Sequence, residues 1–144
     1  MNIIRFCFVS FFLIFFSCSN NSSDELFIVA SLGEYYKHIE KNPNMQLVDL
    51  EDLLPNVKLD IRYATENNFT GEVIYNLPKA YLRKPVANAL KLAQDSLKFY
   101  NLGFKVFDAY RPYQATVKFF EVYPDTNFVA NPKYGSRHNR GCAV

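Results

Sequence analysis

The stretch Phe104-Lys105-Val106-Phe107-Asp108-Ala109-Tyr110-Arg111-Pro112 predicts the centre of the fold. Its first four residues are mainly apolar and predict a short strand, and Gly103 before them is suited to end a preceding helix in the left-handed conformation. The proline has the fixed φ of a first helical turn, so we expect a helix over residues 112–124. Arg111 is therefore expected where a strand passes into a helix.

Hydropathy patterns on both sides of this stretch predict one α+β domain with a small antiparallel sheet flanked by helices. The other expected elements are a helix over 26–41, strands over 47–50 and 57–63, a loop at 67–71, a helix from Pro85 to Leu97, a loop over 131–141 and the start of a buried strand at 142–144. A domain that ends on the first residues of an apolar strand has no cap or tail. We therefore expect the domain to be truncated at its C-terminus.

Composition narrows the class of protein. A chain of 144 residues is too short for two domains, and 49% apolar with 21% charged residues is too hydrophobic for intrinsic disorder. The net charge of +2, with acids and bases interspersed, predicts no nucleic-acid-binding face. Cys7 and Cys18 lie in or next to the apolar leader, which leaves Cys142 alone in the body. This excludes an internal disulfide framework and predicts a buried, inert thiol at Cys142.

The first residues have the pattern of an export signal. Residues 1–17 carry one charge and an apolar run, which indicates a signal peptide, and the small residue before Cys18 resembles the site of a bacterial lipoprotein signal. We expect lipidation of Cys18, a polar spacer over 18–25 and the folded domain over 26–144. A plain secretory signal and an uncleaved anchor remain as alternatives. In each case the domain is exported to the cell envelope, and a diacylated cysteine would hold it on a membrane.

Two residues of the body are candidates for chemistry. His138 lies in a polar loop just before an apolar strand, a setting that suits a metal-binding imidazole. A single ligand gives too little affinity for zinc, so an ordinary hydrogen-bonded histidine remains the alternative. The Arg111 guanidinium, at a strand end, suits a carboxylate or a developing oxyanion. Its alternative is an exposed salt bridge with Asp108.

Three separated segments carry a resemblance to a known family. They are Asp60-Ile61-Arg62-Tyr63-Ala64-Thr65-Glu66-Asn67-Asn68-Phe69-Thr70-Gly71, then Phe107-Asp108-Ala109-Tyr110-Arg111-Pro112, and then Ser136-Arg137-His138-Asn139-Arg140-Gly141-Cys142-Ala143-Val144. In this order they resemble the D-alanyl-D-alanine dipeptidases, the VanX-like zinc peptidases. The resemblance covers residues 47–144 and implies the fold shared by zinc DD-peptidases and hedgehog amino-terminal domains.

The resemblance implies zinc-dependent hydrolysis of D-Ala-D-Ala to free D-Ala in cell-wall metabolism. His138 would be the first zinc ligand and Arg111 would stabilise the oxyanion of the tetrahedral intermediate. Tyr63 and Ser136 match positions that shape the dipeptide pocket. Gly141 would allow a close turn between the ligand loop and a strand.

The resemblance also implies an incomplete zinc dipeptidase domain over residues 26–144. The family's aspartate ligand belongs immediately after Val144, and the Glu-x-x-His segment with the general base and third ligand lies further downstream. The chain as given is therefore expected to be inactive by itself. Its expected partners are the D-Ala-D-Ala dipeptide and a membrane, with no nucleic acid and no obligate protein partner. Two alternatives remain: a DD- or LD-carboxypeptidase acting on peptidoglycan stem peptides, and a non-catalytic lipoprotein that binds the cell wall.

Overall fold

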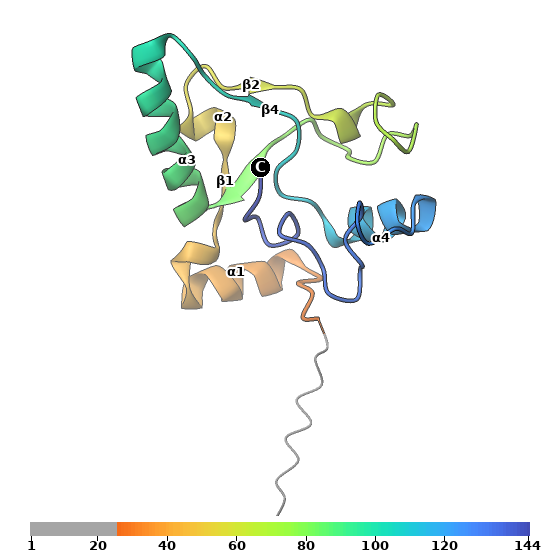
Figure 1. Cartoon of the computed structure of the whole chain (residues 1–144). Coiled ribbons are helices and arrows are strands. Elements are labelled where there is room, and N and C mark those ends of the chain that lie inside the picture. Colours follow the sequence, from red (N-terminus) through yellow and green to blue (C-terminus); the bar gives the residue numbers. More distant parts are fainter. Residues whose placement is uncertain (1–25) are drawn as a thin grey trace, which may run out of the picture.

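The computed structural model describes residues 26–144 and confirms a small α+β architecture (Figure 1). The elements are α1 (Leu32–Lys41), η1 (Pro43–Met45), β1 (Leu47–Asp49), α2 (Leu50–Leu53), β2 (Lys58–Leu59), η2 (Arg62–Ala64), β3 (Tyr81–Arg83), α3 (Lys84–Leu97), η3 (Lys98–Tyr100), β4 (Lys105–Val106) and α4 (Tyr113–Val122). The predicted leader, Cys18 and the spacer lie outside the described residues. Within residues 26–144 no helix has both the length and the hydropathy of a membrane span.

The strands form two separate pairs. β1 and β3 are antiparallel, with Val48 opposite Leu82, whereas β2 and β4 are parallel, with Lys58 opposite Lys105. The predicted antiparallel sheet is therefore found in one pair, and the parallel pair was not predicted. The strand expected over 57–63 is shorter than predicted and covers only Lys58–Leu59. The chain enters the 3₁₀ helix η2 at Arg62, directly after the buried residue Ile61.

Several helix boundaries differ from the prediction; the helix expected over 112–124, for example, is α4 and ends at Val122. The first helix begins at Leu32 and not at residue 26, because the Ser31 hydroxyl accepts a hydrogen bond from the Glu34 amide and caps the helix there. The left-handed residue after α3 is Asn101, with φ of 57°, and not Gly103. The helix continues as η3 to Tyr100, so the stop comes two residues early, and asparagine tolerates this conformation. Pro85 lies in the first turn of α3 as predicted.

The end of the chain also differs from the prediction. Residues 142–144 form no strand with any described residue, and Cys142 is exposed, so the predictions of a buried strand and a buried thiol are wrong. The preceding residue is held against β3, because the Arg83 amide donates to the Gly141 carbonyl at 2.9 Å, and the Cys142 amide donates to the Arg137 carbonyl at 3.0 Å. The C-terminus consequently lies in the middle of the molecule beside β3 (Figure 1).

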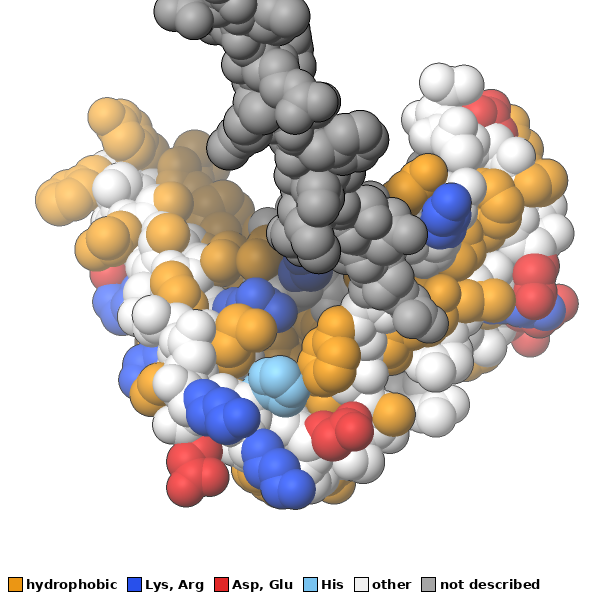
Figure 2. Space-filling view, turned by 90° about the horizontal axis from the view of Figure 1, so that it is seen from below, with side chains coloured by type: hydrophobic (Ala, Val, Ile, Leu, Met, Phe, Trp, Pro, Cys, Tyr) orange, Lys and Arg blue, Asp and Glu red, His pale blue; other side chains and the backbone are white. Residues whose placement is uncertain are grey.

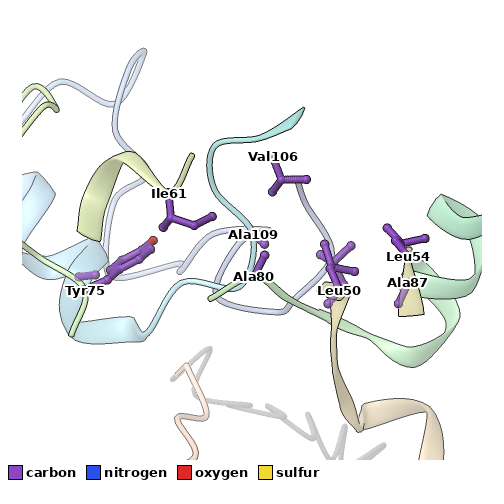
Figure 3. Close-up of a cluster of buried hydrophobic side chains, with 10 residues drawn as sticks. Leu50, Leu54, Ile61, Tyr75, Ala80, Ala87, Val106 and Ala109 are labelled. Atoms are coloured by element: carbon purple, nitrogen blue, oxygen red, sulfur yellow. The ribbon is translucent and has the colours of Figure 1, made fainter. Parts of the chain in front are cut away.

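One hydrophobic core joins the elements (Figure 3). Its buried members are Leu50, Leu54, Ile61, Tyr75, Ala80, Leu82, Ala87, Val106, Ala109 and Ala115. The core extends from Leu54 and Ala87 beside α3 to Tyr75 at the opposite end. Burial of a valine side chain contributes roughly 1.5–3 kcal/mol, so Val106, with the small buried Ala109 beyond it, fixes the start of the segment that follows β4.

The α1 side of the molecule carries mixed chemistry. Seen from below, hydrophobic side chains are interspersed with basic and acidic ones (Figure 2), and the exposed apolar side chains of α1 include Leu32 and Tyr36. Helix α1 is joined to the sheet by the Tyr35 hydroxyl, which accepts a hydrogen bond of 2.8 Å from the Leu47 amide.

Candidate active site

The segment after β4 brings Arg111 and His138 together. The Tyr110 amide donates to the Tyr81 carbonyl at 2.8 Å, which attaches this segment to β3. The next amide, that of Arg111, donates to the His138 carbonyl at 3.0 Å. Two residues predicted for one site, 27 positions apart in sequence (138 minus 111), are thus joined through their backbones.

The Arg111 side chain is held in a buried position. Its Nη2 donates to Asp108 Oδ2 at 2.6 Å, and its Nε donates to the Tyr75 hydroxyl at 3.4 Å. The guanidinium carbon lies 4.6 Å from the centre of the Phe119 ring and 5.5 Å from that of Tyr63, as in cation–π contacts. Burial by itself would lower the pKa of Arg111, but the Asp108 carboxylate outweighs it and raises that pKa above its usual value.

Asp108 is the hub of this arrangement. Its carboxylate accepts hydrogen bonds from the Tyr75 hydroxyl at 2.9 Å, from the Ala109 amide at 2.9 Å and from Arg111. Its Oδ2 also lies 3.4 Å from His138 Nδ1. From sequence, Asp108 was expected only as the partner of Arg111 in an exposed salt bridge. The ion pair exists, but only 11% of the Arg111 side chain and 13% of the Asp108 side chain are exposed, so that description is wrong.

The orientation of the His138 ring follows from its hydrogen bond. Nδ1 lies 2.8 Å from the Ala109 carbonyl oxygen. Because a carbonyl oxygen can only accept, Nδ1 carries the proton, and in the neutral ring Nε2 then has the free lone pair. This is the arrangement by which proteins orient metal-binding histidines. His138 therefore fits the role of one zinc ligand.

The described residues do not complete a zinc site. Among residues 26–144 no group of three or more His, Cys, Asp or Glu side chains is arranged to hold a metal ion. Catalytic zinc usually has three protein ligands. His138 fits one of these positions, and the donor set present in residues 26–144 is insufficient by itself.

The loop that carries His138 is attached to α4 by the Asn139 amide group. Its Nδ2 donates to the Arg111 carbonyl and to the Thr116 hydroxyl, each at 2.9 Å, and its Oδ1 accepts from the Ser136 amide at 2.8 Å. Ser136 returns the interaction, because its hydroxyl accepts from the Asn139 amide at 3.0 Å. Ser136, predicted to line a substrate pocket, is thus buried and closes the loop in this structure.

Tyr63 lies next to the guanidinium, as predicted for a residue of the same site. Its ring centre is 4.5 Å from that of Phe119 and 5.6 Å from that of Tyr75. Burial raises the pKa of the Tyr63 hydroxyl above its usual value. The structure therefore brings Tyr63, Arg111 and His138 to one place, with Ser136 two residues before the histidine.

The close approach expected at Gly141 is present. Its φ is +63°, and a Cβ at this position would lie 2.9 Å from Leu47 Cδ2 and 3.2 Å from the Arg83 amide nitrogen. A side chain here would push the His138 loop away from β1 and β3. Glycine is required for both conformation and space.

Four residues of the arrangement had no predicted role in the site: Tyr75, Asp108, Thr116 and Asn139. Tyr75, Thr116 and Asn139 act through hydrogen bonds to residues 23 or more positions away in the sequence. Asp108 matters because its ion pair with Arg111 is buried. The arrangement combines an imidazole whose Nε2 makes no hydrogen bond to any described residue with a guanidinium whose Nη1 makes none either. Such a pair can bind and polarise a carbonyl or carboxylate oxygen.

Comparisons with known proteins identify the family of the chain. A family model described as D-ala-D-ala dipeptidase (peptidase M15) matches residues 43–143. The D-alanyl-D-alanine dipeptidase of Escherichia coli (strain K12) is 33% identical over 99 residues, which cover 69% of this chain and 51% of the relative. The D-alanyl-D-alanine dipeptidase of Enterococcus faecalis (strain ATCC 700802 / V583) is 33% identical over 89 residues, which cover 59% of this chain and 44% of the relative.

The chain thus spans about half the length of these curated relatives. The family match begins after α1 and includes every residue of the site described above. Because it covers well over half of the chain, the chain belongs to the D-ala-D-ala dipeptidase family of peptidases.

Proposed function

We propose that this chain contributes Arg111 and His138 to a dipeptidase that hydrolyses D-Ala-D-Ala to free D-Ala in cell-wall metabolism. The observation that supports the proposal most directly is the shared anchoring of these two side chains. Arg111 and His138 are joined by a backbone hydrogen bond, and Asp108 and its neighbour Ala109 orient both side chains. Membership of the D-ala-D-ala dipeptidase family supports the substrate class.

In this proposal the Arg111 guanidinium stabilises the oxyanion that forms when the peptide carbonyl is attacked. Removal of such a donor typically costs roughly 3–4 kcal/mol of transition-state stabilisation. Tyr63 and Ser136 shape the dipeptide pocket. The fold shared with zinc DD-peptidases and hedgehog amino-terminal domains is part of the same proposal.

Zinc dependence is also proposed. His138 supports it, because its Nε2 makes no hydrogen bond to any described residue while Nδ1 is held by the Ala109 carbonyl. Residues 26–144 hold no complete ligand set, so the proposal requires zinc ligands besides His138, and it requires a general base. When bound, zinc supplies Lewis-acid polarisation in enzymes of this kind.

The test is an activity assay on the complete reading frame that contains these 144 residues. The protein is purified with zinc, and release of D-Ala from D-Ala-D-Ala is measured. Arg111→Lys should lower kcat by roughly 10²- to 10³-fold, because lysine keeps the charge and loses the planar pair of donors. No release of D-Ala at any zinc loading would contradict the proposal.

Two further substrates separate the dipeptidase from its alternatives. Faster release of D-Ala from a stem pentapeptide than from the dipeptide would identify a carboxypeptidase. Binding of peptidoglycan fragments without turnover would identify a non-catalytic wall-binding protein. The dipeptidase proposal requires turnover of the free dipeptide to be the fastest of these reactions.

We also propose export and lipidation at Cys18, on the leader pattern alone. Metabolic labelling with a radioactive fatty acid should mark the protein, and Cys18→Ser should abolish the label. Equal labelling of both forms would contradict lipidation at this residue.

A further inference from the structure

We propose that Tyr75 is a positioning residue for Arg111 and acts by locking one edge of its guanidinium; this inference rests on the proposed function. The Tyr75 hydroxyl lies between two members of the site. It is 2.9 Å from Asp108 Oδ1 and 3.4 Å from Arg111 Nε. The residue is 8% exposed and belongs to the hydrophobic core (Figure 3).

The direction of both hydrogen bonds is determined by their chemistry. An ionised carboxylate can only accept, so the Tyr75 hydroxyl donates its proton to Asp108. A guanidinium can only donate, so a lone pair of the same oxygen accepts from Arg111 Nε. Burial, with the Asp108 charge, raises the pKa of Tyr75 far above its usual value, so the hydroxyl keeps the proton that this arrangement needs.

The two contacts occupy one edge of the guanidinium. Nε and Nη2 share the side edge of the planar group, and they bind Tyr75 and Asp108. The Phe119 ring lies against one face at 4.6 Å. The other end of the group, with both protons of Nη1 and the second proton of Nη2, has no partner among the described residues. The protein therefore uses the side edge for positioning and leaves the end edge for a substrate oxygen.

Loss of the Tyr75 hydroxyl would free Nε of the guanidinium without leaving a cavity in the core. Phenylalanine retains the ring that packs 5.6 Å from Tyr63. Nε would lose its partner, and Asp108 Oδ1 would keep only the Ala109 amide. The guanidinium could then rotate about its one remaining hydrogen bond, from Nη2 to Asp108 Oδ2. Displacement of a catalytic group by about 1 Å can cost up to 10²-fold in rate.

The experiment compares Tyr75→Phe with a matched control in the complete, zinc-loaded enzyme. Tyr123→Phe is the control, because Tyr123 is 48% exposed and packs on Phe128, whereas the aromatic rings against the guanidinium are those of Tyr63 and Phe119. Tyr75→Phe should lower kcat on D-Ala-D-Ala by roughly 10- to 100-fold with KM changed less than about threefold. Tyr123→Phe should leave both constants unchanged.

A second readout does not depend on activity. In ¹⁵N-arginine-labelled protein, the Nε–H resonance of Arg111 should exchange with water at least about tenfold faster in Tyr75→Phe, because its buried partner is gone. A double-mutant cycle with Asp108→Asn should be non-additive, since the two residues hold the same group. Melting curves of each variant confirm that it is folded.

Three outcomes separate the inference from the proposed function. An active wild-type enzyme with unchanged kcat in Tyr75→Phe would overturn the positioning role. Unchanged exchange at Nε would overturn it as well. An inactive wild-type enzyme in which Nε exchange still depends on Tyr75 would contradict the proposed function and support the lock on Arg111.

Discussion

Two ion pairs of this protein have the same sequence spacing and nearly the same length, yet they lie in very different surroundings. Arg111 Nη2 lies 2.6 Å from Asp108 Oδ2, and the two side chains are 11% and 13% exposed. Lys98 and Asp95 have the same spacing of three residues. Lys98 Nζ lies 2.7 Å from Asp95 Oδ1, and the two side chains are 54% and 37% exposed. The first pair lies beside α4 and the second at the end of α3, on opposite sides of the molecule (Figure 1).

The difference lies in the number of partners each charge has. Asp108 also binds Tyr75 and the Ala109 amide, and Arg111 lies on an aromatic ring. Asp95 binds two flexible lysines in contact with water. Exposed pairs of this kind contribute little to stability, whereas loss of one member of a buried pair leaves an unpaired charge in a poorly solvated site. Distance alone therefore does not identify a functional pair.

The largest expected effect is that of Asp108→Ala. The substitution leaves the buried Arg111 guanidinium and the Tyr75 hydroxyl without their acceptor. We expect a loss of roughly 3–5 kcal/mol in the free energy of unfolding, measured by urea denaturation. A loss below about 1 kcal/mol would mean that the buried pair behaves like an exposed one.

A second comparison uses one glycine from each region. Gly141→Ala places a Cβ 2.9 Å from Leu47 at a φ of +63°, and should cost roughly 1–3 kcal/mol. Gly103, which follows η3, has open space around its Cβ position and no positive φ, so Gly103→Ala should be close to neutral. Thermal unfolding of the two variants measures the contrast. Equal shifts in Tm would show that the approach of the His138 loop to β1 does not constrain the backbone.

The raised pKa of Tyr75 predicts a pH dependence. Because the folded pKa lies above the unfolded value of about 10, the contribution of the neutral hydroxyl is fully present below pH ~10 and is lost as the pH rises through the folded pKa. Above pH ~10 stability should fall by up to about 1.4 kcal/mol per pH unit through this group. Tyr75→Phe should remove that part of the slope in urea titrations between pH 10 and 11. An unchanged slope would show that Tyr75 ionises normally in the folded protein.

The smallest effect is expected for Asp95→Asn. Hydrogen bonds from Lys91 and Lys98 lower the pKa of Asp95 in the folded protein. The contribution of Asp95 to stability is therefore present above the ordinary pKa of an aspartate, and it is lost as the pH falls through the lowered pKa. The group is exposed and screened by salt. The urea midpoint should not change measurably at pH 7 and moderate salt. A shift as large as that of Asp108→Ala would remove the contrast between the two regions.

Much of the fold could be predicted from local patterns. Pro85 and the apolar stripe of α3 predicted the longest helix, and the strand-to-helix passage at Arg111 is present. The short strand β3 was missed, because Tyr81–Arg83 has no extended alternation and is strand-like only through its pairing with β1. The stop at Asn101 was assigned to Gly103, because both residue types suit the left-handed conformation and only the length of η3 decides between them.

The candidate site was predicted in part for the same reason. Motif order indicated Tyr63, Arg111 and His138, which the structure brings together. The surroundings of the Asp108–Arg111 pair come from distant residues: Tyr75 donates a hydrogen bond to Asp108, and the Phe119 ring lies against the guanidinium. No feature within a few residues of Asp108 distinguishes a buried carboxylate from an exposed one.

The amino-acid sequence by itself determined the class of fold, the longest helices, the glycine at the close approach and the family to which the chain belongs. Only the tertiary structure decided which groups surround the guanidinium, because Tyr75 and Asp108 are 33 positions apart and meet only when the chain has folded. Helical and strand periodicity depends on residues that are close together in the sequence. A hydrogen bond between distant segments, and the burial that makes it strong, depends on the packing of the whole core.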